Sequence, residues 1–255
     1  MGRALVTGPT SGIGNAFARR LAADGYDLVL VARNVPRLES LAAELRAVGV
    51  QVEVIPADLA ERQQMARVEA RLNDSSAPID VLVNNAGFSI NQHFVGGSLA
   101  REQVLLDVLV TAVMRLTHTA VPGMVERGRG VVINVSSMAG FLPFGSYSAS
   151  KAWVTFFTQG LATELAGTGV KAIATCPGFV HTEFHQRAGV DMSSSSDWMW
   201  STTDEVVDKL FRDLAHGKVL SIPGARYRAM AGAAHLLPRD AVRRLERFRR
   251  GRLTR

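Results

Sequence analysis

The chain has few of the features that mark a secreted or membrane protein. It contains one cysteine, Cys176, so an internal disulfide is excluded and a reducing cytosol is the expected environment. Residues 1–3 lead directly into a strand-like run at 4–6, without the regions of a secretory signal peptide. The longest uncharged runs, such as 131–150, contain Asn, Ser, Gly and Pro, which predicts strand and loop rather than membrane spans. We therefore expect a cytoplasmic protein.

The body of the chain also lacks a net positive charge. The formal net charge is +6, but residues 226–255 hold ten arginines against two acidic residues, so the remaining 225 residues carry −2. This distribution gives no reason to expect a nucleic-acid partner. The tail repeats apolar residues at roughly helical spacing: Leu237, Ala241, Leu245 and Phe248. A basic amphipathic helix can lie on an anionic membrane, but a solvated helix packed on its own domain is the favoured interpretation.

Clustered metal ligands are missing as well. His181 and His185 have an i, i+4 spacing, but no third ligand is grouped with them, so no metal site is expected. Cys176 precedes Pro177 at a predicted strand end. It is expected to be a buried small apolar residue rather than a redox centre.

The sequence does contain a repeated alternation of strand-like and helix-like segments, and 47% of its 255 residues are hydrophobic. Strands are expected at 3–6, 27–31, 50–55, 79–83, 131–135, 170–175 and 219–222. Helices are expected between them, up to about 23 and at about 36–47, 60–73, 101–126, 147–166 and 203–215. The pattern predicts an α/β fold with a doubly wound parallel sheet of the Rossmann type. We expect about seven strands, helices on both faces and a single domain.

Residues 1–225 are expected to form the dinucleotide-binding and catalytic domain, and residues 226–255 a basic C-terminal helical extension. We expect residues 183–203 to form a long segment without regular structure, and such a segment inside a domain is usually a lid. Thr202 and Glu205 have the spacing of a capping box for the helix that follows. The buried side of the long helix at 101–126 is expected to contain Val104, Leu105, Val108, Leu109, Ala112, Leu116 and Ala120.

A glycine-rich turn, Thr7-Gly8-Pro9-Thr10-Ser11-Gly12-Ile13-Gly14, joins the first strand to the first helix. Gly8 permits the tight turn, and Gly12 and Gly14 allow backbone to approach a phosphate and the helix to pack closely on the sheet. The start of the helix offers free N–H groups and a partial positive charge to a pyrophosphate. The context favours a dinucleotide site over a loop that merely needs glycines.

The residues after the second and third strands bear on the choice of dinucleotide. NAD-binding proteins of this type have an acidic residue after the second strand, where this chain has Ala32-Arg33. A guanidinium suits a 2′-phosphate, so we expect NADP(H) rather than NAD(H). The alternative is that Arg33 is a solvated loop charge. Asp58, after the third strand, is expected to cap the next helix, to contact an adenine edge, or both.

The segment 130–151 has the layout of a proton-transfer site. Its strand ends in Ser136 and Ser137, and a bend leads to Tyr147 and Lys151, which lie on one helix face. A lysine cation near the phenol is expected to lower the tyrosine pKa from about 10 toward working pH. A hydroxyl at the strand end can hold a substrate oxygen beside the tyrosine.

These motifs together resemble the short-chain dehydrogenase/reductases over almost the full chain. The resemblance rests on five features in order: the glycine-rich turn, Asn84-Asn85-Ala86-Gly87, Ser137, Tyr147-x-x-x-Lys151, and Pro177-Gly178 with Thr182 following. Each feature lies at a predicted strand end.

The resemblance implies a role for each matching residue. Tyr147 would be the catalytic acid/base, Lys151 would lower its pKa and hold the nicotinamide ribose, and Ser137, rather than Ser136, would bind the substrate carbonyl oxygen. The resemblance implies further cofactor contacts along the chain. They are Gly8, Ser11, Gly12, Ile13 and Gly14 at the pyrophosphate and adenosine, Asp58 at the adenine, Asn84, Ala86 and Gly87 along the adenine ribose, and Pro177, Gly178, Val180 and Thr182 at the nicotinamide end. Arg33 joins them because a guanidinium suits the 2′-phosphate.

The chain departs from the family pattern at two places. Many members carry a helix asparagine that kinks the long helix and holds a water for proton relay, and Leu109 aligns with it here. Asp107 and Thr111 are nearby substitutes that face other directions. The spacing from Ser137 to Tyr147 is ten residues, which is shorter than the family pattern and predicts a tight loop through Pro143 and Gly145.

The predicted function is NADP(H)-dependent hydride transfer between nicotinamide and a carbonyl or secondary alcohol. Trp198, Met199 and Trp200 either anchor the lid or form an apolar substrate wall, and a wall would favour an apolar substrate. The alternative, motivated by Leu109, is a catalytically weakened cofactor-binding regulatory or scaffold protein. Nucleotide-sugar or lyase chemistry is disfavoured, because such relatives have longer C-terminal substrate domains. The resemblance also implies a homodimer or homotetramer.

Overall fold

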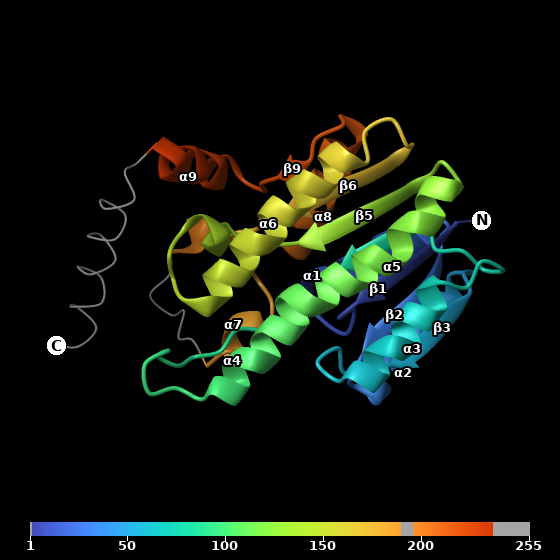
Figure 1. The fold of residues 1–255 in the computed structure, drawn as a ribbon, viewed down its shortest axis with the longest axis horizontal. Helices are drawn as coiled ribbons and strands as arrows, with labels where there is room; N and C mark the ends of the chain where they lie inside the picture. The colour runs from blue at the N-terminus through green and yellow to red at the C-terminus, as the bar shows by residue number, and fades with distance from the viewer. Residues whose placement is uncertain (1, 190–195, 237–255) are drawn as a thin grey trace.

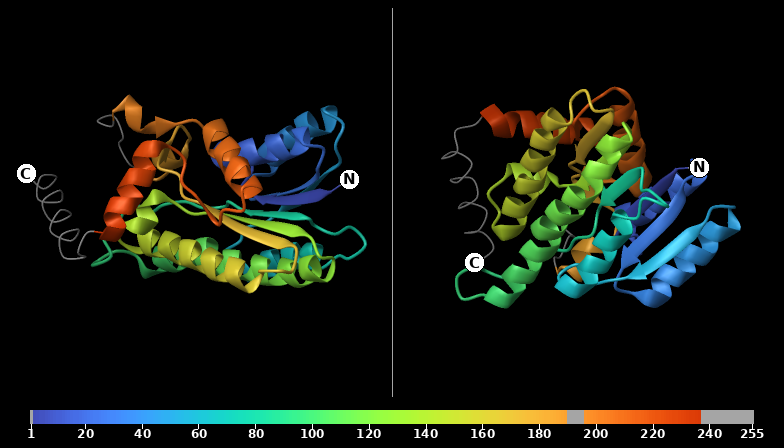
Figure 2. Two further views of the ribbon diagram at one scale, coloured as in Figure 1. Left: turned by 90° about the horizontal axis from the view of Figure 1, so that it is seen from above. Right: turned by 45° about the vertical axis from the view of Figure 1, so that its right-hand side comes forward.

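The strands place alternate side chains into two separate cores. In a computed structural model, which describes residues 2–189 and 196–236, Ala4 and Val6 of the first strand face one apolar cluster, while Leu5 faces the other. This period of two is the geometry of a strand buried on both faces. The helices cover both clusters, so the sheet is the middle layer of three (Figures 1 and 2).

Seven parallel strands form the main sheet, in the order β3-β2-β1-β4-β5-β6-β9. Their bounds are β1 Arg3–Thr7, β2 Asp27–Ala32, β3 Val52–Pro56, β4 Val81–Asn84, β5 Gly130–Val135, β6 Val170–Thr175 and β9 Leu220–Ser221. The strand order reverses next to β1, which is the feature of doubly wound sheets that opens a ligand crevice at the carboxyl ends of the strands. The predicted fold class is confirmed.

Helices α1 (Gly12–Ala23), α2 (Val35–Ala47) and α8 (Thr203–Ala215) cover one face. The other face is covered by α3 (Arg62–Leu72), α5 (Ala112–Glu126) and α6 (Ser146–Glu164). The remaining helical segments lie at the carboxyl edge of the sheet or lead into these helices: α4 Leu99–Leu106, a 3-10 turn Met138–Phe141, α7 Phe184–Arg187, a 3-10 turn Asp197–Met199 and α9 Ala225–Leu236.

The predicted long helix is continuous, but it is not uniform. A π-helical segment, Asp107–Thr111, separates α4 from α5. The predicted buried side is confirmed except for Val104, which is 39% exposed although its neighbour Leu105 on α4 is buried. By length and composition the helix Leu99–Glu126 is able to cross a membrane, with a mean hydropathy of 1.6 over its best 18 residues. This is weak evidence, since 44% of that window is buried and α5 packs on the sheet.

The segment between β6 and α8 has more structure than expected. The described part of 183–203 contains α7, a 3-10 turn and a short strand, β8 (Trp200–Ser201), which pairs with β7 (Phe179–Val180). The expectation of an irregular excursion is therefore wrong there. Residues 193–195 of the serine run and the apolar tail residues 237–248 lie outside the described residues.

The capping box of α8 gives a stability test. The Thr202 hydroxyl accepts from the Glu205 N–H at 3.2 Å, and the Glu205 carboxylate accepts from the Thr202 N–H at 2.9 Å. We expect Thr202→Ala to lower the free energy of unfolding by about 1 kcal/mol, because an N–H group of the helix start loses its partner. Urea unfolding measures this. Thr202→Ser is the matched control, and an unchanged midpoint for Thr202→Ala contradicts the assignment.

Candidate active site

The three predicted catalytic residues meet at the carboxyl edge of the sheet. Ser137 follows β5, and Tyr147 and Lys151 lie in the first turns of α6. The Ser137 hydroxyl is hydrogen-bonded to the Tyr147 phenol. The Lys151 ammonium lies 5.9 Å from the centroid of the Tyr147 ring and donates to the Val135 carbonyl at 2.7 Å. One strand end and one helix start therefore supply the whole constellation.

A tight turn makes the short spacing between Ser137 and Tyr147 possible. The 3-10 turn Met138–Phe141 begins with the Ser137 hydroxyl accepting from the Ala139 N–H at 3.1 Å. Gly140 lies against α6: a Cβ there would be 2.9 Å from the Lys151 carbonyl carbon. Gly145, with φ of +85°, precedes the first residue of α6. The glycines let the loop reverse direction while it touches the helix it leads into.

Ser136, the neighbour of Ser137, is directed into the interior. Its hydroxyl donates to the Lys151 carbonyl at 2.7 Å and lies 2.7 Å from Thr155 Oγ1. Cys176 is fully buried, with its Sγ 3.5 Å from the same Thr155 oxygen. Ser137 is thus the serine of the pair that faces the tyrosine.

Burial, rather than the lysine, sets the protonation of the tyrosine. It raises the pKa of Tyr147 to about 12, and the Ser137 hydrogen bond offsets this only in part. The expected net lowering of the Tyr147 pKa toward working pH is therefore wrong for this structure, because burial outweighs the nearby ammonium, which donates to the Val135 carbonyl. Burial also lowers the pKa of Lys151 to about 8, so the lysine is charged at neutral pH and titrates just above it.

Leu109 approaches Gly87 from the long helix. It is fully buried in the π-helical segment. A Cβ on Gly87 would lie 2.9 Å from Leu109 Cδ2 and 3.7 Å from Lys151 Nζ, so both side chains lie near this glycine. Asp107 instead accepts from Gln103 at 2.9 Å on the same helix. An apolar side chain therefore stands in this region of the site, where the family pattern has an amide.

The glycine-rich turn fits a pyrophosphate. Gly8 and Gly12 have φ of +65° and +58°, and a Cβ on Gly14 would be 2.3 Å from the Gly8 carbonyl oxygen. Helix α1 has no side-chain cap and no acidic residue in its first turn, so its first N–H groups have no side-chain partner and keep their positive potential.

Asn85 holds this turn in place, a role that the sequence motif did not predict. Its amide donates to the carbonyls of Thr7 and Gly8 at 2.9 and 3.0 Å, while the Thr7 hydroxyl accepts from the N–H groups of Asn85 and Ala86. The signal was available, because Thr7 ends β1 and Asn85 directly follows β4, its neighbour in the sheet.

Arg33 and Asp58 lie side by side after β2 and β3. Arg33 Nη1 is 3.4 Å from Asp58 Oδ2, and the Arg33 side chain is 70% exposed, so a weak contact leaves the guanidinium accessible. Asp58 accepts from the Ala60 N–H at 3.0 Å, but the helix N-cap is Glu61. The expectation that Asp58 caps the helix itself is wrong; it stabilises the turn before it.

Two predicted cofactor residues point their side chains elsewhere. The Asn84 amide donates to Thr117 and Asn134 in the interior, and Val180 is 4% exposed within β7. Both side chains are therefore directed into the interior; for Asn84 the reason is that the last residue of β4 faces the core. The predicted cofactor contacts of these two residues stay predictions, and they would have to be made by the backbone.

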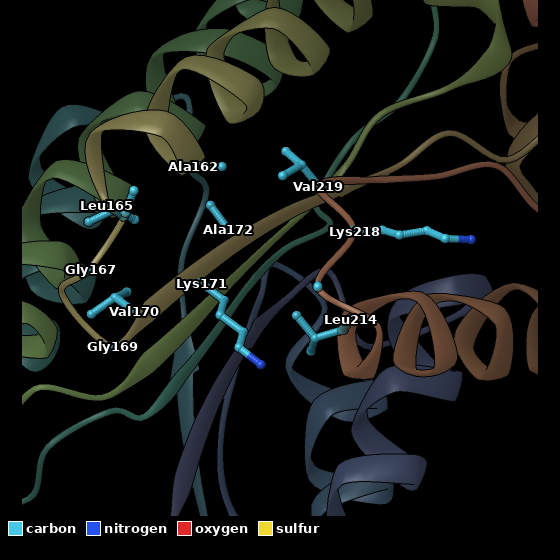
Figure 3. A pocket seen from close by; sticks show the side chains of 12 residues that line it. Ala162, Leu165, Gly167, Gly169, Val170, Lys171, Ala172, Leu214, Lys218 and Val219 are labelled. Atoms are coloured by element: carbon cyan, nitrogen blue, oxygen red, sulfur yellow. The ribbon is translucent and has the colours of Figure 1, made fainter.

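Thr182 approaches the glycine-rich turn from the other side. A Cβ on Gly12 would be 2.9 Å from Thr182 Cγ2. The two segments border a polar cavity of about 410 Å3, lined by Thr10, Ser11, Gly12, Asn15, Ala16, Arg19, His181, Thr182, Glu183, Thr203 and Asp204. A second cavity of about 310 Å3 lies at the opposite end of β6, where Lys171 and Lys218 line its rim (Figure 3). The second cavity is remote from the catalytic residues.

Phe184, Arg226 and Tyr227 were missed from the sequence. The Phe184 ring in α7 lies 5.8 Å from the Tyr147 ring, between centroids. The Tyr227 hydroxyl donates to the Met199 carbonyl and accepts from the Phe179 N–H, and Arg226 donates to the Trp200 carbonyl at 2.8 Å. These contacts tie the segment 179–201 to α9. These hydrogen bonds join residues that are 26 to 48 positions apart in the sequence, so no local sequence pattern predicts them.

Gly178 and the tryptophans complete this region. A Cβ on Gly178 would lie 1.9 Å from the Tyr227 ring, so the glycine makes room for that ring. Trp198 is 63% exposed, whereas Trp200 stacks on His181 with centroids 4.7 Å apart. Among the described residues, no group of three or more potential ligands could hold a metal ion.

A doubly wound sheet, a phosphate-binding turn and a Ser-Tyr-Lys centre at the same strand edge define a dinucleotide-dependent oxidoreductase of the Rossmann class. The sequence model for short chain dehydrogenases matches residues 3–192. A putative ketoacyl reductase from Streptomyces coelicolor is 38% identical over 217 residues, covering 81% of this chain and 80% of the relative. The ketoacyl reductase HetN of a Nostoc species is 38% identical over 69% of this chain, which spans only 62% of that protein.

A solved structure agrees with these relatives. The short-chain dehydrogenase from Sphingobium yanoikuyae, in complex with NADPH, is 37% identical, has a TM-score of 0.84, and is matched over 92% of this chain and 94% of that chain. The chain belongs to the short-chain dehydrogenase family of oxidoreductases.

Lys151 should make the free energy of unfolding depend on pH between its pKa in the folded protein and its pKa in the unfolded chain. Its pKa falls from 10.5 to about 8 on folding, so between these values the unfolded chain binds more protons and stability rises with pH. Between pH 7.5 and 9.5 we expect the wild type to gain on the order of 2 kcal/mol relative to Lys151→Met in urea unfolding. The raised pKa of Tyr147 acts only above about pH 10. A difference between the two proteins that stays constant with pH contradicts the burial of the ammonium.

Proposed function

We propose that the protein is an NADP(H)-dependent oxidoreductase that transfers a hydride between nicotinamide and the carbonyl or secondary-alcohol carbon of an apolar substrate. The observation that carries this proposal is the contact of Ser137 with Tyr147 beside the charged Lys151, at the strand edge that also holds the phosphate-binding turn. The bound cofactor would supply or accept the hydride.

The residues of the chain would handle the proton and the oxygen. Ser137 would donate a hydrogen bond to the substrate oxygen, and Tyr147 would give that oxygen its proton as negative charge develops on it. A phenol with a pKa of about 12 is protonated at neutral pH, so it can act as the proton donor when a carbonyl is reduced. Lys151, charged below about pH 8, would stabilise the phenolate that remains.

The preference for NADP(H) is supported by Arg33. Its exposed guanidinium stands after β2, where it is suited to a 2′-phosphate. The relative from Sphingobium yanoikuyae was solved with NADPH. An apolar substrate is supported by the Phe184 ring against Tyr147 and by relatives named as ketoacyl reductases.

Replacing the tyrosine tests the reaction. Tyr147→Phe keeps the ring but removes the proton donor, so turnover of apolar ketones should fall roughly 100-fold or more. The dissociation constant of NADPH, measured by fluorescence titration, should stay within about twofold. A variant with wild-type turnover contradicts the mechanism. Binding of NADPH by a wild type that reduces none of a panel of ketones and oxidises none of the matching alcohols would instead favour a cofactor-binding scaffold.

Replacing the arginine tests the cofactor. Arg33→Ala should weaken NADPH binding about tenfold, because charge-assisted hydrogen bonds to a phosphate are lost. NADH lacks that phosphate and is the internal control, so its dissociation constant should not change. Equal weakening of both cofactors contradicts the assignment of Arg33 to the 2′-phosphate.

A further inference from the structure

A buried carboxylate lies on α4 near the helix that carries Tyr147. Glu102 is 7% exposed, and its Oε1 accepts from the Gln92 amide at 2.8 Å. The same amide nitrogen donates to the Ser98 carbonyl at 3.1 Å, and the Ser98 N–H donates back to Gln92 Oε1 at 3.3 Å. Gln92 therefore closes the loop 92–98 on itself and joins it to Glu102.

Ser146, the first residue of α6 and the neighbour of Tyr147, is the second partner of this carboxylate. The Gln92 amide and the Ser146 hydroxyl lower the pKa of Glu102, so the carboxyl is ionised at neutral pH. The other carboxylate oxygen, Oε2, has no partner within ordinary hydrogen-bonding distance. A buried negative charge beside the start of α6 is favoured by the helix dipole.

The loop that Glu102 contacts extends from the surroundings of Lys151 to the segment that follows α7. It begins after Gly87, which lies next to Lys151. Asn91 donates to the Gly189 carbonyl at 3.1 Å, in the segment that follows α7. Farther along, Phe94 is 69% and Val95 is 90% exposed. The stretch 88–98 thus spans from the lysine to the segment that carries Phe184, and it presents an apolar surface.

We propose that Glu102 is a positioning and specificity-determining residue, which acts through Gln92 to fix the loop 92–98 against the start of α6 and so sets the size of the apolar group that can reach Tyr147. This inference rests on the proposed function. Glu102 contacts no reacting atom, and it acts only through the position of the loop 92–98. Glu102→Gln would keep an oxygen that can accept from the Gln92 amide, so the truncation Glu102→Ala is the variant that removes the anchor.

Steady-state kinetics with a small and a bulky ketone, butanone and acetophenone, separate this role from a structural one. Glu102→Ala should change the ratio of the two KM values by about fivefold or more, with kcat and the NADPH dissociation constant within about twofold. Gln92→Ala should do the same, and the double variant should be no worse than either single variant. Asp107→Ala is the matched control, because it also removes a carboxylate that accepts from a glutamine on this helix.

Limited proteolysis gives a readout that needs no reaction. Arg101, exposed next to Glu102, should be cleaved faster by trypsin in Glu102→Ala than in the wild type or Asp107→Ala, because the loop before it has lost its anchor. If the wild type reduces no ketone, the proposed function fails while cleavage still tests the anchor. Unchanged cleavage and an unchanged KM ratio overturn the proposal, and so does a uniform loss of kcat, KM and NADPH binding.

Discussion

Four buried polar side chains fix the centre of the molecule. Asn84 on β4 donates to Thr117 on α5 at 3.0 Å and to Asn134 on β5 at 2.9 Å, and Asn134 donates to Thr158 on α6 at 2.9 Å. Unpaired amides and hydroxyls are costly in an interior, so these bonds set two strands and two helices in one relative position. Because α6 carries the tyrosine and the lysine, the geometry of the site depends on this chain of bonds.

Burial then decides the protonation of the site. It raises the pKa of the tyrosine and lowers that of the lysine, so the pair is a neutral phenol and an ammonium at neutral pH. Leu109, fully buried on the long helix, and the Lys151 ammonium both lie near Gly87. The chain thereby keeps a proton donor and a positive charge within one small volume, which is the arrangement that carbonyl reduction needs.

Much of the fold could be predicted because its signals are local. Strand β6 and helix α8 have the bounds that periodicity and the capping box indicated, and the site motifs could be placed because parallel strands end at one edge. Other features depend on tertiary packing and could not be predicted from local signals. They are the inward direction of the Asn84 side chain, the packing of the Tyr227 ring against Gly178, and the hydrogen bond between Gln92 and Glu102. The tyrosine pKa was mispredicted because spacing shows the lysine but not the burial.

The most direct test of the account is the fate of the transferred hydrogen. NADPH deuterated at C4 on the face that is used, incubated with the wild type and an apolar ketone, should leave deuterium on the carbinol carbon of the alcohol product by mass spectrometry. Tyr147→Phe should form almost none of this product while still binding NADPH. Alcohol without deuterium at that carbon, from NADPH labelled on either face, would contradict the account.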